Sequence, residues 1–183
     1  MSEIFPTKPK TIALVGMMGV GKSSVGRRLA AALHLPFRDA DTEVEIAAGR
    51  TIVEIFEELG ESAFREGERR VIARLLDDPP HVLATGGGAF AHPVTRALIR
   101  QRAISVWLKT DLEVLARRVG RRSTRPLLQG KDSLSVLTAL AAERYETYGE
   151  ADICIDTADG PHSVAVDQII QALKTHSSST VAP

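Results

Sequence analysis

Gly16-Met17-Met18-Gly19-Val20-Gly21-Lys22-Ser23 is the stretch of sequence that decides the fold. It has the form G-x-x-x-x-G-K-[ST], and it follows the apolar run Thr11–Val15 directly and opens a segment of helical period. In such a loop the backbone N–H groups point inward at phosphates, and the dipole of the following helix adds positive charge. We expect Lys22 to reach the β- and γ-phosphates of a nucleotide and Ser23 to ligate Mg²⁺. The alternative is a glycine-rich turn without a ligand.

Short apolar runs alternate with longer segments of helical period along the rest of the chain. This alternation predicts an α/β fold in which parallel strands are joined by crossover helices. The predicted strands are residues 11–15, 36–39, 81–85, 103–108 and 153–156. The predicted helices are residues 22–33, 42–48, 52–76 with a break at Gly60, 93–101, 111–119, 133–147 and 161–174.

The size and composition are typical of one globular domain. The chain has 183 residues, of which 44% are hydrophobic and 25% are charged. We expect a core of about residues 11–174, with loose tails at 1–8 and at the Ser-rich 175–183. The 23 basic residues balance 23 acidic ones, so the whole molecule has no electrostatic reason to bind nucleic acid or a membrane.

Targeting segments, membrane spans and cysteine content indicate in which cellular compartment a protein works. No signal-like run precedes residue 10, and no apolar segment approaches the roughly 20 residues that span a bilayer. A single cysteine, Cys154, cannot form an internal disulfide, and its apolar neighbours predict a buried, inert thiol. We therefore expect a cytoplasmic protein.

Two carboxylates follow the second predicted strand. Asp39 and Asp41 are two residues apart, which is the repeat of a strand, so both can face the ligand crevice at the carboxyl edge of a parallel sheet. Phosphoryl transfer to an alcohol needs a group that accepts or orients the hydroxyl proton. The alternative is that Asp41 only caps the helix that begins at Thr42.

Glycines and arginines make up the remaining candidate site. Gly86, Gly87 and Gly88 follow the third predicted strand, where they allow a small anion to lie against the backbone, unless they form a plain turn. Arg65 and Arg144 lie on predicted helices, where a solvated side chain is the commoner fate. Five arginines in residues 117–125 predict a basic loop that closes over a triphosphate, with a nucleic-acid patch as the alternative.

The order of these features resembles that of the shikimate kinases. The phosphate loop is followed by Asp39-Ala40-Asp41, Phe64-Arg65, the glycine triplet, Arg125-Pro126-Leu127-Leu128, and Arg144 with Tyr148 four residues later. The resemblance runs from about residue 11 to residue 174. It implies a three-layer α/β/α P-loop kinase fold with a five-stranded parallel sheet and a mobile lid at about residues 118–131. It also implies ATP-dependent phosphorylation of the 3-hydroxyl of shikimate, in the pathway to chorismate and the aromatic amino acids, by a monomer.

The resemblance also implies a role for each matching residue. Asp41 would hold the shikimate hydroxyls and act as the base, Arg65 and Arg144 would bind the carboxylate, and Gly86 to Gly88 would contact the ring substituents. ATP would contact Gly16, Met17, Met18, Gly19, Val20, Gly21, Lys22, Ser23 and Ser24. Arg125 would reach the phosphates from the lid, Arg118 would lie against the adenine, and Asp39 would bind Mg²⁺ through water.

Two other functions share part of this pattern. A kinase for gluconate or for a nucleoside monophosphate would keep the phosphate loop and the lid but would not need this set of substrate residues. A nucleotide-dependent switch or an inactive regulatory domain is the second alternative. The sequence lacks the Asn-Lys-x-Asp guanine motif of GTPase switches, and its candidate catalytic set is complete.

Overall fold

The computed structural model describes residues 10–120, 132–157 and 160–179. Its strands are β1 (Thr11–Val15), β2 (Phe37–Asp39), β3 (Val82–Ala84), β4 (Ala103–Lys109) and β5 (Ile153–Asp156). Its helices are α1 (Lys22–Leu33), α2 (Ala40–Ala48), α3 (Ile52–Asp77), α4 (Pro93–Arg102), α5 (Leu112–Gly120), α6 (Ser133–Tyr148) and α7 (His162–Ser179). The predicted order of strands and helices is therefore confirmed, with most ends within one or two residues.

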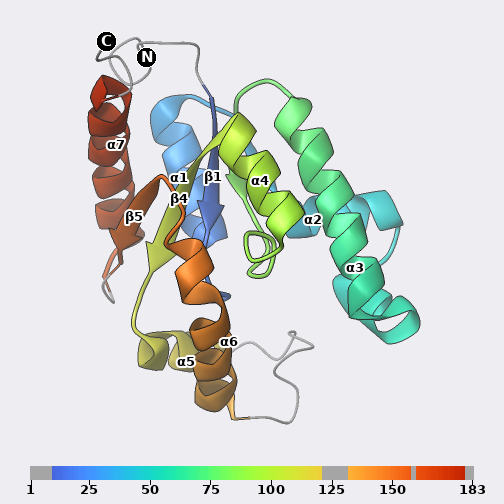
Figure 1. Ribbon diagram of the computed structural model, residues 1–183. Coiled ribbons are helices and arrows are strands. Elements are labelled where there is room, and N and C mark those ends of the chain that lie inside the picture. The colour runs from blue at the N-terminus through green and yellow to red at the C-terminus, as the bar shows by residue number, and fades with distance from the viewer. Residues whose placement is uncertain (1–9, 121–131, 158–159, 180–183) are drawn as a thin grey trace.

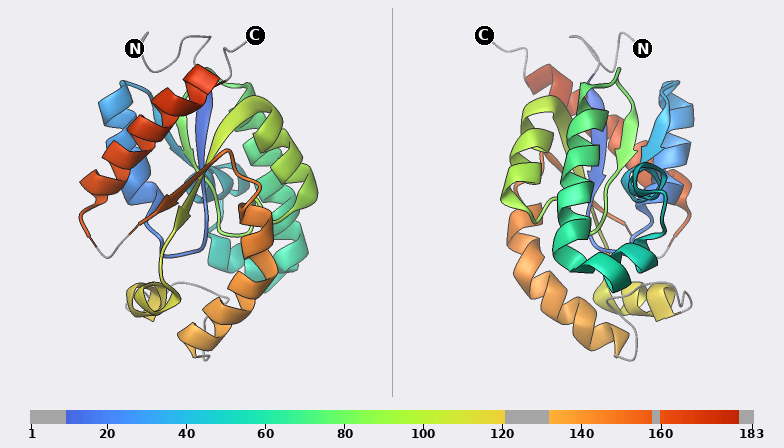
Figure 2. Two further views of the ribbon diagram at one scale, coloured as in Figure 1. Left: turned by 60° about the vertical axis from the view of Figure 1, so that its left-hand side comes forward. Right: turned by 90° about the vertical axis from the view of Figure 1, so that its right-hand side faces the viewer.

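The five strands form one parallel sheet in the order β2-β3-β1-β4-β5. β1 lies at its centre, and Leu14 pairs with Ala84 of β3 and with Val106 of β4. All five residues of β1 are buried because helices cover both faces of the sheet. α1 and α7 pack together on one face, and α3 and α4 pack together on the other (Figures 1 and 2). The architecture is the predicted three-layer α/β/α fold.

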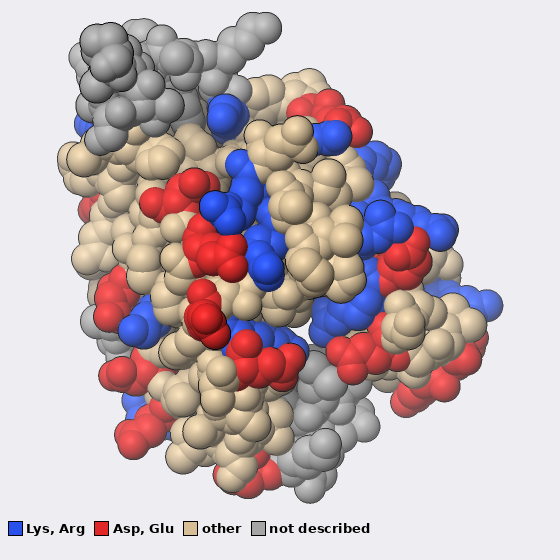
Figure 3. Space-filling model, in the orientation of Figure 1, with Lys and Arg blue, Asp and Glu red and all other residues tan. Residues whose placement is uncertain are grey.

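The carboxyl ends of the strands point toward α5 and α6, which lie beyond that edge of the sheet (Figure 1). The phosphate loop and the glycine triplet follow β1 and β3 at this edge, and Asp39 is the last residue of β2. Parallel α/β sheets bind their ligands there. Basic and acidic side chains are interspersed over the face shown in Figure 3, as the zero net charge leads one to expect.

The long helix α3 contains the predicted break. Gly60 has φ 82° and ψ 170°, and helical geometry resumes after it. The helix begins with a capping box, in which the Thr51 side chain accepts from the Glu54 N–H while the Glu54 carboxylate accepts from the Thr51 N–H. The two segments of α3 therefore meet at a kink, and α3 packs against α2.

Three expectations were wrong. The tail was expected to be loose from Thr175, but α7 continues to Ser179, because no Gly or Pro interrupts it and Ile169 and Leu173 anchor it in the core. α2 begins at Ala40 rather than Thr42, because Asp39 caps it. Cys154 is exposed rather than buried, because β5 is an edge strand whose residues alternate between the core and solvent.

Within the described ranges, none of the helices combines the length and the apolar character that crossing a bilayer requires.

Candidate active site

The phosphate loop is held tightly between β1 and α1. Gly16 has φ 134°, and a Cβ atom there would lie 2.5 Å from the Leu108 carbonyl oxygen of β4, so only glycine fits. The Lys22 ammonium donates to the Gly16 carbonyl at 2.7 Å and to the Met17 carbonyl at 2.9 Å. Lys22 thus folds back across the loop, in the position from which it can meet a phosphate.

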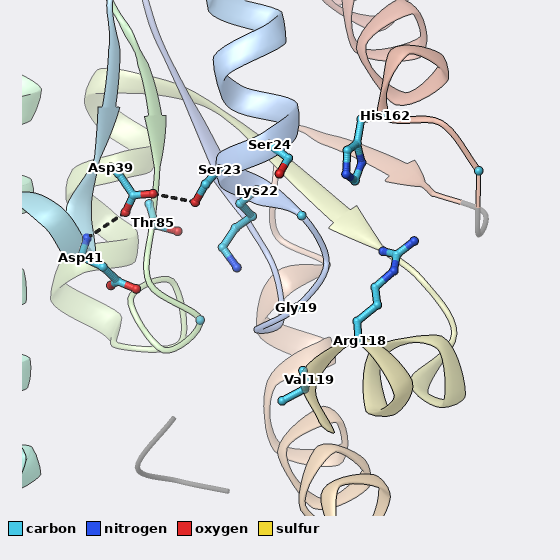
Figure 4. A pocket seen from close by; sticks show the side chains of 13 residues that line it. Gly19, Lys22, Ser23, Ser24, Asp39, Asp41, Thr85, Arg118, Val119 and His162 are labelled. Carbon is cyan, nitrogen blue, oxygen red and sulfur yellow. Dashed lines mark hydrogen bonds between the residues drawn. The ribbon is translucent and has the colours of Figure 1, made fainter. Parts of the chain in front are cut away.

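Ser23 and Asp39 meet directly at the edge of the sheet. The Ser23 hydroxyl donates to Asp39 Oδ2 at 2.6 Å, and Asp39 Oδ1 accepts from the Asp41 N–H at 3.1 Å (Figure 4). Asp39 is the N-cap of α2, and Asp41 lies in the first turn of that helix. The two carboxylates lie on the same side, as expected. The reason is that Asp39 caps α2 and Asp41 lies in its first turn, and not the two-residue repeat of a strand. Asp41 is not the cap.

These residues line a first pocket of about 400 Å³, which we call the donor pocket (Figure 4). Its wall comes from the phosphate loop, the ends of β2 and β3, α5 and the start of α7. The lining residues are Gly19, Gly21, Lys22, Ser23, Ser24, Asp39, Asp41, Thr85, Gly87, Arg118, Val119, Gly160 and His162. Polar and cationic groups on one side and carboxylates on the other suit a magnesium-bound phosphate chain.

His162 is a donor-pocket residue that sequence reasoning missed. Its imidazole lies against Gly21 of the phosphate loop, and it also lines a smaller neighbouring pocket of about 200 Å³ together with Arg118. Burial lowers the pKa of His162, and the cations Arg28 and Arg118 lower it further. His162 opens a helix after Pro161, and nothing in the sequence distinguishes it from an ordinary surface residue.

A second pocket of about 430 Å³, which we call the acceptor pocket, lies next to the first. Asp41 and Gly87 border both pockets. The lining residues are Met18, Asp41, Glu45, Thr51, Ile52, Val53, Phe56, Phe64, Arg65, Glu68, Gly86, Gly87, Gly88 and Arg144. A cavity with apolar walls, two guanidinium groups and several carboxylates suits a small molecule that carries both a carboxylate and hydroxyl groups.

The glycine triplet forms the floor of the acceptor pocket. A Cβ at Gly88 would lie 2.6 Å from the Arg65 guanidinium carbon, and one at Gly86 would overlap Glu68 Oε1. The preceding residue, Thr85, fixes the start of this loop, because its hydroxyl donates to the Leu14 carbonyl at 2.9 Å. The glycines therefore let two charged side chains approach the backbone closely.

The charged side chains of the acceptor pocket interact with one another. Arg65 Nη1 donates to Glu68 Oε2 at 2.8 Å, and Arg65 also pairs with Glu61 at 3.2 Å. Glu68 is only 2% exposed, and burial raises the pKa of its carboxyl although Arg65 opposes the change. Sequence reasoning missed Glu68, yet its position three residues after Arg65 on a helix was a usable signal for proximity.

The boundary between the two pockets is held by α6. Arg144 Nη1 donates to the Gly87 carbonyl at 3.2 Å, and the Tyr148 hydroxyl donates to the same oxygen. Tyr148 is completely buried, and burial raises its pKa to about 12. The phenol is therefore protonated at neutral pH and serves as a permanent donor to Gly87.

The structure brings together most of the residues that the sequence singled out. The loop residues that line the donor pocket, with Asp39, Asp41 and Arg118, are Gly19, Gly21, Lys22, Ser23 and Ser24. Met18 lines the acceptor pocket with Arg65, Arg144 and the triplet, and Gly16, Met17 and Val20 line neither of the two pockets. Arg125 and the remainder of the expected lid, residues 121–131, lie outside the described residues. The expected role of Arg125 therefore stays a prediction.

Known proteins with closely similar sequences are shikimate kinases. The family model described as shikimate kinase matches residues 18–174. A shikimate kinase from Caulobacter vibrioides is 66% identical over 172 residues, which cover 94% of this chain and 86% of that protein. One from Bradyrhizobium diazoefficiens is 58% identical over 167 residues, which cover 91% and 81% of the two chains.

Solved structures agree with the sequence comparison. The structure of a shikimate kinase from Acinetobacter baumannii in complex with shikimate superimposes with a TM-score of 0.90 at 40% identity. The match covers 96% of this chain and 98% of the other. This chain belongs to the shikimate kinase family.

Proposed function

We propose that this protein transfers the γ-phosphoryl group of ATP to the 3-hydroxyl of shikimate, giving shikimate 3-phosphate and ADP in the pathway to chorismate. The observation that carries this proposal is the shared wall of the two pockets. Asp41 and Gly87 border both, so a phosphate end in the donor pocket and a hydroxyl in the acceptor pocket would meet there. Holding two reactants in this way converts their encounter into a step within one complex.

The donor half would be formed by the phosphate loop from Gly16 to Ser24. Its backbone N–H groups and the N-terminus of α1 would bind the phosphates, and Lys22 would exchange its contacts with the Gly16 and Met17 carbonyls for phosphate oxygens. Arg118 and its smaller neighbouring pocket would receive the adenine. Arg125, by family resemblance, would come onto the phosphates from the lid.

The residues at Ser23 and Asp39 fit a magnesium ion. A hydroxyl and a carboxylate oxygen lie 2.6 Å apart and face the donor pocket, and Mg²⁺ prefers oxygen ligands and keeps several waters. We propose that Ser23 ligates Mg²⁺ and that Asp39 holds it through water. The ion would offset the charge that develops on the phosphate oxygens.

The acceptor half would bind the two kinds of polar group that shikimate carries, its carboxylate and its hydroxyls. Arg65 and Arg144 would bind the carboxylate, and Gly86 to Gly88 would contact the ring through backbone groups. Asp41 would accept the hydroxyl's hydrogen bond and then its proton as the oxygen attacks phosphorus. Gly87, fixed by Tyr148, would keep the ring aligned with the donor pocket.

A coupled assay that follows ADP release tests the function. Purified protein with ATP and Mg²⁺ should turn over rapidly with shikimate and should show only background turnover with gluconate or AMP. Turnover with gluconate or AMP but not with shikimate would contradict the proposed acceptor. Nucleotide binding without turnover on any of the three would instead favour a nucleotide-dependent switch.

We also propose that the protein works as a monomer in the cytoplasm. Both pockets are built from this single chain, and ATP is a cytoplasmic metabolite. Light scattering of the purified protein at the concentration of the assay checks the monomer, because a dimer would double the measured mass.

A further inference from the structure

Two buried polar atoms in the acceptor pocket have no hydrogen-bond partner among the described residues. They are Glu68 Oε1 and Arg144 Nε. The two residues are only 2% and 7% exposed. An unpaired buried polar group is destabilising, and more so when it is charged. The pocket therefore lacks a hydrogen-bond donor for Glu68 Oε1 and an acceptor for Arg144 Nε.

Charged groups from three helices face Glu68. Arg65 of α3 binds Glu68 Oε2, Asp41 of α2 lies across Gly86, and Arg144 approaches from α6. Burial raises the pKa of the Glu68 carboxyl, Arg65 and Arg144 lower it, and Asp41 raises it. In the free pocket these four groups balance, with two guanidinium ions for two carboxylates.

Other titratable groups near the pocket already have partners. Glu45 accepts from the Ile52 N–H at 2.9 Å, and Glu61 binds the outer side of Arg65 with its side chain half exposed to solvent. Tyr148 is neutral, since its pKa is about 12. Glu68 is a buried carboxylate with an unpaired oxygen, and none of these other groups is.

A substrate carboxylate disturbs this balance. When it takes contacts from Arg65 and Arg144, three carboxylates share two guanidinium ions in a buried space, and the charge excess is costly. We propose that Glu68 takes up one proton from solvent when the carboxylate of shikimate binds, so that shikimate and a proton enter the pocket together. This inference rests on the proposed function.

Glu68 is the carboxylate best placed to accept that proton. Asp41 also borders the donor pocket, and in the proposed mechanism it has to be ionised to receive the proton of the hydroxyl, while both arginines would hold the substrate carboxylate. Protonation at Oε1 forms an O–H bond on the oxygen that has no partner, while Oε2 keeps its contact with Arg65.

The consequence is a dependence of shikimate affinity on pH. If binding takes up one proton, affinity falls as pH rises above the pKa of Glu68 in the free protein, by up to about tenfold per pH unit. Below that pKa the group is already protonated, and affinity stops changing. ATP affinity should not follow this curve, because Glu68 does not line the donor pocket.

Titration calorimetry of the full chain with shikimate tests the proposal. At about pH 7.5, the observed enthalpy is measured in buffers of different ionisation enthalpy, and its slope gives the number of protons taken up. We expect uptake between zero and one for the wild type and none for Glu68→Gln. The matched control is Glu61→Gln, which removes the exposed carboxylate partner of Arg65 and should keep the wild-type uptake.

The outcomes separate this inference from the proposed function. Binding without any buffer dependence, together with wild-type affinity that stays flat between about pH 6.5 and 9, would contradict proton uptake and leave the function intact. Undiminished uptake in Glu68→Gln would also overturn it. Absence of shikimate binding to the wild type would contradict the function itself, and this inference with it. The wild-type measurements decide the matter even if the variant fails to fold.

Discussion

Among the described residues, Asp41 is the charged side chain that borders both pockets. It reaches this place because Asp39 caps α2 and turns the next residues toward the edge of the sheet. The neighbouring Asp39 is bound to Ser23 and to the Asp41 N–H, so the two similar carboxylates have different partners. The proposed roles of Asp41 as proton acceptor and of Asp39 as water-mediated metal ligand rest on this difference.

Asp41→Asn should lower kcat by about 10²- to 10⁴-fold, because an amide cannot accept the hydroxyl proton. ATP affinity should change little, since the phosphate loop and Lys22 are untouched. Steady-state turnover and nucleotide titration measure the two effects. Glu43→Gln on the same helix, which lines neither pocket, is the control and should keep near-normal activity. Near-normal turnover in Asp41→Asn would remove Asp41 from the mechanism.

Arg65→Ala should raise the KM for shikimate by about 10²- to 10³-fold, because it removes a carboxylate contact and leaves Glu68 buried without its cation. The KM for ATP should stay within a few-fold of the wild type. Initial rates at varied shikimate and ATP separate these constants. Arg69→Ala removes an arginine that pairs with Glu66 outside both pockets, and it is the control. A rise in the KM for ATP alone would show that Arg65 is misassigned.

At the scale of elements, helix ends and helix faces shape the acceptor pocket. The capping box of α3 fixes the start of the helix beside Glu45, which also binds the Ile52 N–H. The second segment of α3 then carries Phe64, Arg65 and Glu68 to the glycine loop. α6 closes the other side with Arg144 and Tyr148 four residues apart, on one face of the helix.

Thr51→Ala should lower the free energy of unfolding by about 1 kcal/mol, because the α3 N-terminus loses its cap. Urea unfolding of the variant and the wild type measures this difference. Thr138→Ala is a matched control within α6, where the hydroxyl only bonds a carbonyl one turn back, and it should cost little. Equal stability of Thr51→Ala and the wild type would show that the capping box contributes nothing measurable.

Tyr148→Phe should lower kcat/KM for shikimate by roughly tenfold, because the Gly87 carbonyl loses a donor at the boundary of the two pockets.

Tyr148→Phe should also change the free energy of unfolding at alkaline pH. The folded protein keeps the Tyr148 proton up to about pH 12, whereas an unfolded tyrosine loses it near the ordinary value of 10, so wild-type stability falls as pH rises between them. The variant should show a smaller fall. An identical fall in both proteins would contradict the raised pKa of Tyr148 in the folded protein.

At the scale of the whole molecule, local patterns were sufficient to predict the order of strands and helices. Apolar runs, helical periods and the break at Gly60 are properties of neighbouring residues, and they all appear in the structure. The phosphate loop was predictable because strand, loop and helix are contiguous in sequence. Most of the residues implied by family resemblance line two adjoining pockets, whereas Arg125 lies outside the described residues.

Features that depend on tertiary position could not be predicted in this way. Cys154 is exposed because β5 lies at the edge of the sheet, and strand order cannot be read from its apolar neighbours. α7 extends past Lys174 because its buried face stabilises a Ser-rich end with low helix propensity. His162 becomes a site residue only when distant segments meet, whereas Glu68 lies one helical turn after Arg65 and could have been inferred.

Identification of the phosphorylated product tests the central claim most directly. The wild-type protein is incubated with ATP, Mg²⁺ and shikimate, and coupled phosphorus–proton NMR locates the new phosphate on the ring. We predict one product, with phosphorus on the 3-oxygen and one ADP formed for each molecule of product. Phosphorus on another hydroxyl would contradict the 3-oxygen as the acceptor, and ADP with only inorganic phosphate would contradict direct transfer between the two pockets.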